Sequence, residues 1–260
     1  MVFYIFLFVF GALIGSFLNV CIYRIPRGRS IIWPSSRCPS CNNPIRAYDN
    51  IPVISYIFLL RGRCRYCKER ISMRYPLVEA LNACSYLLVF WRFGFGWSSA
   101  IYCVLCSALI VITFIDIDFQ IIPDRITLPG IPIGIAAGSF LLPDPFLRAT
   151  ALGYKAALIG AASGFAFFYM VAFLSIALLK KEGMGGGDVK MMAMVGGFLG
   201  WKGVILTTFL GSLSGSVIGI GLIAFRGREK GSLIPFGPFL ALGAIVSLFF
   251  GQEILMWYLY

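Results

Sequence analysis

The chain has 260 residues, of which 59% are hydrophobic and only 13% are charged, and its mean hydropathy is +0.87. This composition excludes an ordinary soluble domain and indicates a protein embedded in a membrane. Because the chain contains no histidine, Ser-His-Asp hydrolases, Cys-His proteases and H-E-x-x-H metalloproteases are also excluded.

Long apolar runs predict an all-α polytopic membrane protein with about eight transmembrane helices. Most of them approach the roughly 20 residues that cross a bilayer as a helix. The run at 189–200 is short, about 18 Å of helix, so we expect this span to begin inside the glycine-rich segment that precedes it. The eight runs cover residues 1–23, 77–91, 97–115, 126–142, 152–179, 189–200, 203–225 and 233–258.

The net charge of +11 is explained by membrane topology rather than by nucleic-acid binding. In an eight-pass arrangement, 18 of the 22 lysines and arginines fall on one side of the bilayer. The positive-inside rule places that side in the cytoplasm and the N-terminus outside. The first run has no basic start and no cleavage site of small residues, so it is predicted to be a retained anchor, and the bacterial inner membrane is the expected location.

The only sizeable polar region, residues 24–76, contains two C-x-x-C pairs. Cys38 and Cys41 form the first pair, Cys64 and Cys67 the second, and 22 residues separate them. In a reducing cytoplasm this spacing favours a structural Zn²⁺ site in a small zinc-ribbon-like domain. A redox or disulfide pair is the alternative interpretation.

Acidic side chains gather at the end of the third apolar run. A charged residue at the centre of a bilayer costs about 2.5–3.5 kcal/mol, so Asp116 and Asp118 are candidate functional residues. They lie about 200° apart around a helix, so only one can face a given partner. Asp124 is expected to cap the next helix. The alternative for all three is an acidic cluster at the membrane surface beside Arg125.

Four glycines and one aspartate lie between Gly183 and Asp188. Such a segment is either a plain loop or a place where a substrate backbone approaches, at Gly185, Gly186 and Gly187. In the predicted topology Asp188 lies at the same depth and on the same side as Asp116. Two carboxylates in one site predict an aspartic protease dyad, in which one is a base towards water and the other supplies a proton to the departing group.

Several further segments complete a pattern that covers nearly the whole chain. Besides both cysteine pairs, they are Gly11-x-x-x-Gly15-Ser16-Phe17-Leu18-Asn19-Val20, Asp49-Asn50-Ile51-Pro52-Val53-x-Ser55-Tyr56, Ile71-Ser72-x-Arg74-Tyr75-Pro76-Leu77-Val78-Glu79, Asp116-x-Asp118-x-x-x-Ile122-Pro123-Asp124, Gly185-Gly186-Gly187-Asp188-Val189-Lys190 and Pro235-Phe236-Gly237-Pro238-Phe239. With these segments the chain resembles the bacterial type IV prepilin leader peptidases, which belong to the GxGD class of membrane aspartic proteases.

The resemblance implies removal of the basic leader of prepilins or pseudopilins after its glycine, at the cytoplasmic face. It maps the catalytic pair onto Asp116 and Asp188. It also implies methylation of the new N-terminal amine with S-adenosylmethionine, because the four-cysteine domain accompanies that activity in the family. The implied domains are a first helix at 1–23, a cytoplasmic four-cysteine domain at 24–76 and a peptidase core at 77–260.

The residues that would bind S-adenosylmethionine are not assigned. Asp49, Asn50, Arg74 and Glu79 are candidates, but they serve equally well as turn formers and as the start of a helix. An ion-coupled transporter that uses intramembrane aspartates is the alternative from another class of protein. A non-catalytic scaffold of a secretion system is a third reading, while prepilins and the lipid bilayer are the expected partners.

Overall fold

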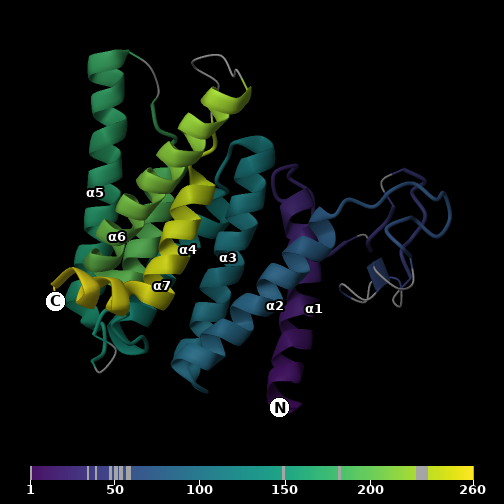
Figure 1. Ribbon diagram of the computed structural model, residues 1–260, viewed down its shortest axis with the longest axis horizontal. Helices are drawn as coiled ribbons and strands as arrows, with labels where there is room; N and C mark the ends of the chain where they lie inside the picture. Colours follow the sequence, from purple (N-terminus) through teal and green to yellow (C-terminus); the bar gives the residue numbers. More distant parts are fainter. Residues whose placement is uncertain are drawn as a thin grey trace. The chain divides into compact units, whose positions relative to one another are not determined.

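A computed structural model describes residues 2–33, 35–38, 40–46, 49, 52, 55–56, 60–147, 150–180, 183–226 and 234–259. Asn50, Ile51, Lys181 and Glu182 therefore lie outside the described residues, as does most of the apolar run at 53–60. In the described part of the chain, regular structure is almost entirely helical, and β pairing is limited to three isolated bridges (Figure 1). The predicted all-helical class is confirmed.

The described residues form seven helices, most of which begin or end within a few residues of a predicted apolar run. Their bounds are α1 Val2–Arg24, α2 Arg74–Phe93, α3 Trp97–Phe119, α4 Asp124–Phe140, α5 Gly153–Leu179, α6 Gly186–Arg226 and α7 Gly237–Leu259.

The prediction of eight spans is not confirmed. Within the described residues, five helices are long and apolar enough to cross a membrane, namely α1, α3, α5, α6 and α7. Helix α4 has only 17 residues, and α6, with 41 residues, consists of two helical segments that meet at Gly200 and correspond to two of the predicted runs. At Gly200 the backbone of α6 leaves the helical conformation, with φ of 72° and ψ of 179°. The shorter run at 189–200 does begin within the glycine-rich segment, because α6 starts at Gly186.

The chain forms two compact units, of which the first is Met1–Val111. In this unit α1 and α2 pack directly against each other. A Cβ atom on Gly15 would lie 2.7 Å from the Cα atom of Glu79, and one on Gly11 would lie 2.8 Å from the Cα atom of Ala83. The two glycines four residues apart therefore let the helix backbones touch, as small residues do in membrane helix pairs. The buried Asn82 side chain adds a hydrogen bond to the Gly11 carbonyl at 2.7 Å.

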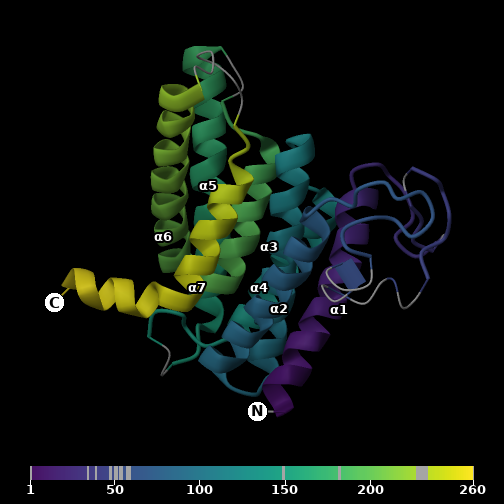
Figure 2. The same cartoon turned by 45° about the vertical axis from the view of Figure 1, so that its right-hand side comes forward.

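The second unit, Ile112–Tyr260, is organised around α6, which packs against α4, α5 and α7 (Figure 2). Close approach again depends on glycine, because a side chain on Gly196 would collide with the backbone of Gly160 on α5. A side chain on Gly164 would likewise collide with the backbone at Met192. The first half of α6 is thus fixed tightly against α5.

Both ends of α6 lie near the start of α7. At the first end, a Cβ atom on Gly187 would meet the Cβ atom of Ile122 at 2.7 Å, and one on Gly237 would lie 3.3 Å from the Cδ1 atom of Ile122. At the other end, Gly219 lies against Ile234, shortly before α7 begins. Helix α6 therefore folds back at its central break, which brings its first turn to the place where α3, α6 and α7 meet.

Candidate functional site

Asp116 lies near the C-terminal end of α3 and is buried, with 5% of its surface exposed. Its Oδ2 atom accepts a hydrogen bond from the backbone N–H of Gly237, at a donor–acceptor distance of 2.9 Å. Asp118, two residues later, is exposed. The two acids thus have opposite environments, as their 200° separation around a helix predicts. Asp116 is the one that faces the protein interior.

Asp188 is the third residue of α6 and is also buried, with 8% of its surface exposed. Its backbone N–H donates to the Gly185 carbonyl at 3.1 Å, which forms the turn that starts the helix. Its carboxyl atom Oδ1 is buried and has no hydrogen-bond partner among the described residues. A buried oxygen without a hydrogen-bond partner destabilises the fold, so it is rare in a side chain with a purely structural role. It is typical of a site where a ligand or substrate supplies the missing partner.

The structure brings the two aspartates into one site in the second unit. Asp116 lies close enough to act electrostatically on Asp188. Ile122 lies against Gly187, the residue before Asp188, and also against Gly237, whose N–H binds Asp116. Two buried carboxyl groups that act on each other electrostatically share one proton more readily than they both ionise. The pair can therefore hold one base and one acid side by side.

The glycines before Asp188 border open space. Gly185 and Gly186 are exposed, and nothing lies within 4 Å of a Cβ atom placed on Gly186. Gly187 is different, because a side chain there would collide with Ile122. An extended segment could therefore approach the carboxyl pair along Gly185 and Gly186, whereas Gly187 is required for helix packing.

Two contacts near the site were not expected from the sequence. The first is the Gly237 N–H that holds Asp116, and its only signal was a glycine between two prolines. The second concerns Asp124, for which the predicted capping role is wrong, because Pro123 occupies the cap and makes no side-chain hydrogen bond. Both Asp124 carboxylate oxygens instead accept hydrogen bonds from the Lys190 ammonium at 2.8 Å, which ties α4 to α6.

The four predicted metal ligands form a cluster in the first unit. The sulfur atoms of Cys38 and Cys67 are 3.8 Å apart, those of Cys41 and Cys64 are 4.0 Å apart, and all four lie within 4.8 Å of one another. Zn–S bonds of about 2.3 Å in a tetrahedron place the sulfur atoms about 3.8 Å from each other. The donor set and its spacing therefore fit a tetrahedral metal site.

The two cysteine pairs have the same local structure. In each pair the backbone carbonyl of the first cysteine accepts a hydrogen bond from the backbone N–H of the residue that follows the second cysteine. The distances are 2.9 Å from Asn42 to Cys38 and 3.1 Å from Lys68 to Cys64. Asn42 and Lys68 both have positive φ, at 55° and 60°. Each pair thus ends in a tight turn with one left-handed residue, closed by the same backbone hydrogen bond.

The comparisons with known proteins cover both units. The family described as "Bacterial Peptidase A24 N-terminal domain" matches residues 9–93, and the "Type IV leader peptidase family" matches residues 103–220. No solved structure gave a significant match.

Curated relatives match over almost the whole chain. A "Prepilin leader peptidase/N-methyltransferase" from Aeromonas hydrophila is 37% identical over 97% of this chain and 92% of its own length. Proteins of the same name from Stutzerimonas stutzeri and Pseudomonas aeruginosa are 38% and 36% identical, over 96% of this chain in both cases. With this identity over nearly full length in both proteins, the chain belongs to the type IV leader peptidase family.

Proposed function

We propose that the chain removes the leader peptide from type IV prepilins or pseudopilins by aspartic protease chemistry and methylates the N-terminus that cleavage creates. The observation that carries the first activity is the pair of buried carboxyl groups, Asp116 on α3 and Asp188 on α6, in one site bordered by exposed glycines. The names of the relatives support both activities. They do not favour the alternative of an ion-coupled transporter.

The contacts of the two aspartates suggest different roles. Asp116 accepts the Gly237 N–H bond, which stabilises an ionised carboxylate, whereas the unpartnered Oδ1 atom of Asp188 favours a protonated, neutral group. Asp116 then takes a proton from water while the water oxygen attacks the scissile carbonyl carbon, and Asp188 donates its proton to the carbonyl oxygen. When the C–N bond breaks, the departing amine takes a proton from the pair.

The experiment that tests this function is mass spectrometry of a pilin co-expressed with the chain, in a bacterium that lacks its own leader peptidase. We expect a pilin that has lost its leader after the glycine and carries one methyl group on the new N-terminal amine. A pilin that keeps its full leader would exclude the peptidase activity, and a shortened pilin without the methyl group would exclude the methyltransferase activity.

Gly237→Ala is expected to slow leader cleavage about tenfold or more, because misplacement of a catalytic group by roughly 1 Å can cost about 100-fold. The new Cβ atom would lie 2.7 Å from the Asp116 Oδ2 atom and would push the carboxylate away. The rate of cleavage of a purified prepilin in detergent measures the effect.

Gly221→Ala is the matched control for this variant, because nothing lies within 4 Å of a Cβ atom at that position. It should cleave at the wild-type rate. Equal rates for Gly237→Ala and wild type would contradict the role given to the contact with Asp116.

The proposed cofactors follow from the first unit. The thiolates of Cys38, Cys41, Cys64 and Cys67 would hold a structural Zn²⁺ ion, which ties residues 24–76 into a small domain. S-adenosylmethionine would supply the methyl group. We further propose that this four-cysteine domain faces the cytoplasm, that the N-terminus lies outside, and that residues 77–260 form the peptidase core within the bacterial inner membrane.

A further inference from the structure

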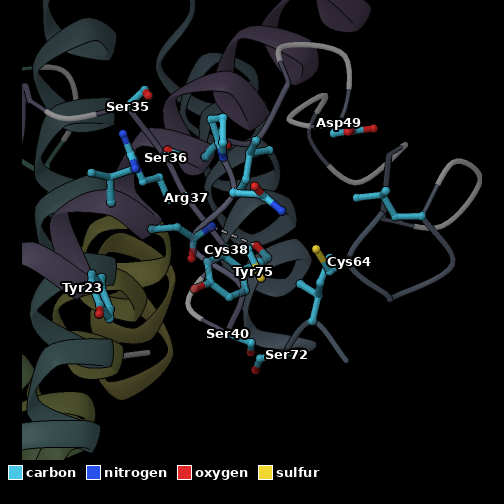
Figure 3. A pocket seen from close by; sticks show the side chains of 18 of the residues that line it. Tyr23, Ser35, Ser36, Arg37, Cys38, Ser40, Asp49, Cys64, Ser72 and Tyr75 are labelled. Atoms are coloured by element: carbon cyan, nitrogen blue, oxygen red, sulfur yellow. Dashed lines mark hydrogen bonds between the residues drawn. The ribbon is translucent and has the colours of Figure 1, made fainter. Parts of the chain in front are cut away.

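The second cysteine turn, residues 63–70, borders two cavities in the first unit. The larger cavity has a volume of about 820 Å³ and is lined by residues of α1, α2 and both cysteine turns, among them Cys38 and Cys64 (Figure 3). The smaller cavity has a volume of about 540 Å³, which is within the roughly 300–1,000 Å³ range of small-molecule sites. Cys64 and Arg65 line both cavities. The two cavities therefore share one edge and differ in the rest of their lining.

The lining of the smaller cavity is almost entirely basic. Its six residues are Leu60, Arg61, Arg63, Cys64, Arg65 and Lys68. The Arg65 guanidinium lies 2.6 Å from the Asp49 carboxylate and is therefore engaged. Arg61, Arg63 and Lys68 are exposed, and within the part of the chain that the structure describes none of them has an acidic partner. Because like charges at one cavity repel each other, a bound anion would stabilise this arrangement.

The first cysteine turn has the same backbone frame without this charge. An isolated β bridge closes residues 37–44 in the first turn and residues 63–70 in the second. In both turns the residue after the second cysteine has positive φ, 55° at Asn42 and 60° at Lys68. Asparagine adopts this conformation more readily than lysine does. The backbone frame therefore does not explain Lys68, nor does it explain Arg61, which also has positive φ at 49°.

The smaller cavity lies close along the chain to a helix that can cross the membrane. Helix α1 is long and apolar enough to do so and ends at Arg24. Near that end, the Asn19 side chain donates a hydrogen bond to the Tyr75 carbonyl in the first turn of α2, at 3.1 Å. The chain between Lys68 and Tyr75 spans at most about 25 Å even when fully extended. Basic clusters that follow a membrane helix this closely are typical of surfaces that recognise anionic lipids.

We infer that the smaller cavity binds the phosphate group of an anionic phospholipid in the leaflet at which α1 ends. Guanidinium groups suit phosphate oxygens because they can donate two parallel hydrogen bonds, and the Lys68 ammonium adds a compact positive charge. Leu60 gives the cavity an apolar contact for the lipid's glycerol part. Inorganic phosphate offers the same oxygen atoms, but a lipid of the surrounding bilayer is held at high local concentration beside the cavity.

The test is native mass spectrometry of the purified full chain in detergent, titrated with phosphatidylglycerol or with phosphatidylcholine. Wild type should bind one phosphatidylglycerol molecule more tightly than phosphatidylcholine, whose headgroup has no net charge. The double variant Arg61→Asn, Lys68→Asn should bind phosphatidylglycerol about 25-fold more weakly, since each cation near a lipid surface contributes about fivefold. Asparagine tolerates the positive φ at both positions, so the turn is kept.

The double variant Arg37→Gln, Arg70→Gln is the matched control. It also removes two charges from the cysteine turns, but Arg37 and Arg70 line only the larger cavity. It should bind phosphatidylglycerol like wild type. An equal loss of affinity in both double variants would show that only the total charge matters and would overturn the site, as would equal binding of the two lipids by wild type.

Three further measurements separate the site from its alternatives. If inorganic phosphate alone bound wild type as tightly as phosphatidylglycerol does, the cavity would be a site for free phosphate. If the asparagine double variant lost its metal but kept its lipid affinity, the cations would serve the thiolates of the cysteine cluster. An unchanged unfolding temperature would show that this variant is folded, and Lys68→Asn alone, with an expected loss of about fivefold, tests the site should the double variant unfold.

Discussion

Replacing Asp188 with asparagine is expected to slow leader cleavage about 100- to 10,000-fold, the usual contribution of a general acid or base. The amide keeps the shape of the side chain but cannot hold or release the proton that the mechanism needs. Asp116→Asn should cause a loss of similar size, because each group acts only with the other. Single-turnover cleavage of a purified prepilin measures both variants.

Asp118→Asn is the control for these variants. It makes the same change two residues from Asp116, but Asp118 is exposed whereas Asp116 is buried. We expect cleavage within about threefold of wild type, in line with the small effects of most surface substitutions. If Asp118→Asn were inactive and Asp116→Asn active, the pair would have to be reassigned.

Cys38→Ser is expected to release the metal and to separate the two activities. Wild type should contain about one Zn²⁺ ion per chain, since four thiolates make one tetrahedral site. Loss of one ligand should lower the zinc content and open the wall of the cavity that Cys38 lines. Methylation should then fall about tenfold or more, while leader cleavage stays within about threefold of wild type.

Cys84→Ser is the matched control for the metal site, because Cys84 lies on an exposed face of α2 outside the cluster. Metal analysis and mass spectrometry of the processed pilin are the measurements. Wild-type protein without zinc would contradict the metal site. Equal loss of cleavage and methylation in Cys38→Ser would contradict the division of the activities.

The positions of the helices could be predicted from apolar runs, but the number of membrane crossings could not. Hydropathy identifies which segments can be buried in lipid, whereas the number of membrane crossings also depends on the length of each helix and on breaks within it. Gly200 bends α6 through one positive φ angle, which a glycine adopts at little cost and which leaves no trace in hydropathy. Helix α2 carries Arg74, Glu79 and Arg92, and it is not among the helices apolar enough to cross.

The proximity of Asp116 and Asp188 could be predicted because the apolar runs put both acids on the same side of the membrane in a chain without histidine, while their catalytic role stays a prediction. The cysteine cluster was predictable from spacing alone. The contact that holds Asp116 was not, because the donor is the backbone N–H of Gly237, and every residue except proline carries such a group. The larger cavity could not be predicted from the sequence either, because α1, α2 and the cysteine turns form it together.

The unpartnered Oδ1 atom of Asp188 has a consequence for the design of inhibitors. A peptide in which the scissile amide is replaced by a tetrahedral carbon bearing a hydroxyl group could donate a hydrogen bond to this atom. No donor in the described part of the chain competes for that position. Such a compound should gain affinity over the same peptide with a methylene group instead, and its selectivity would come from the side chains that flank the leader's glycine.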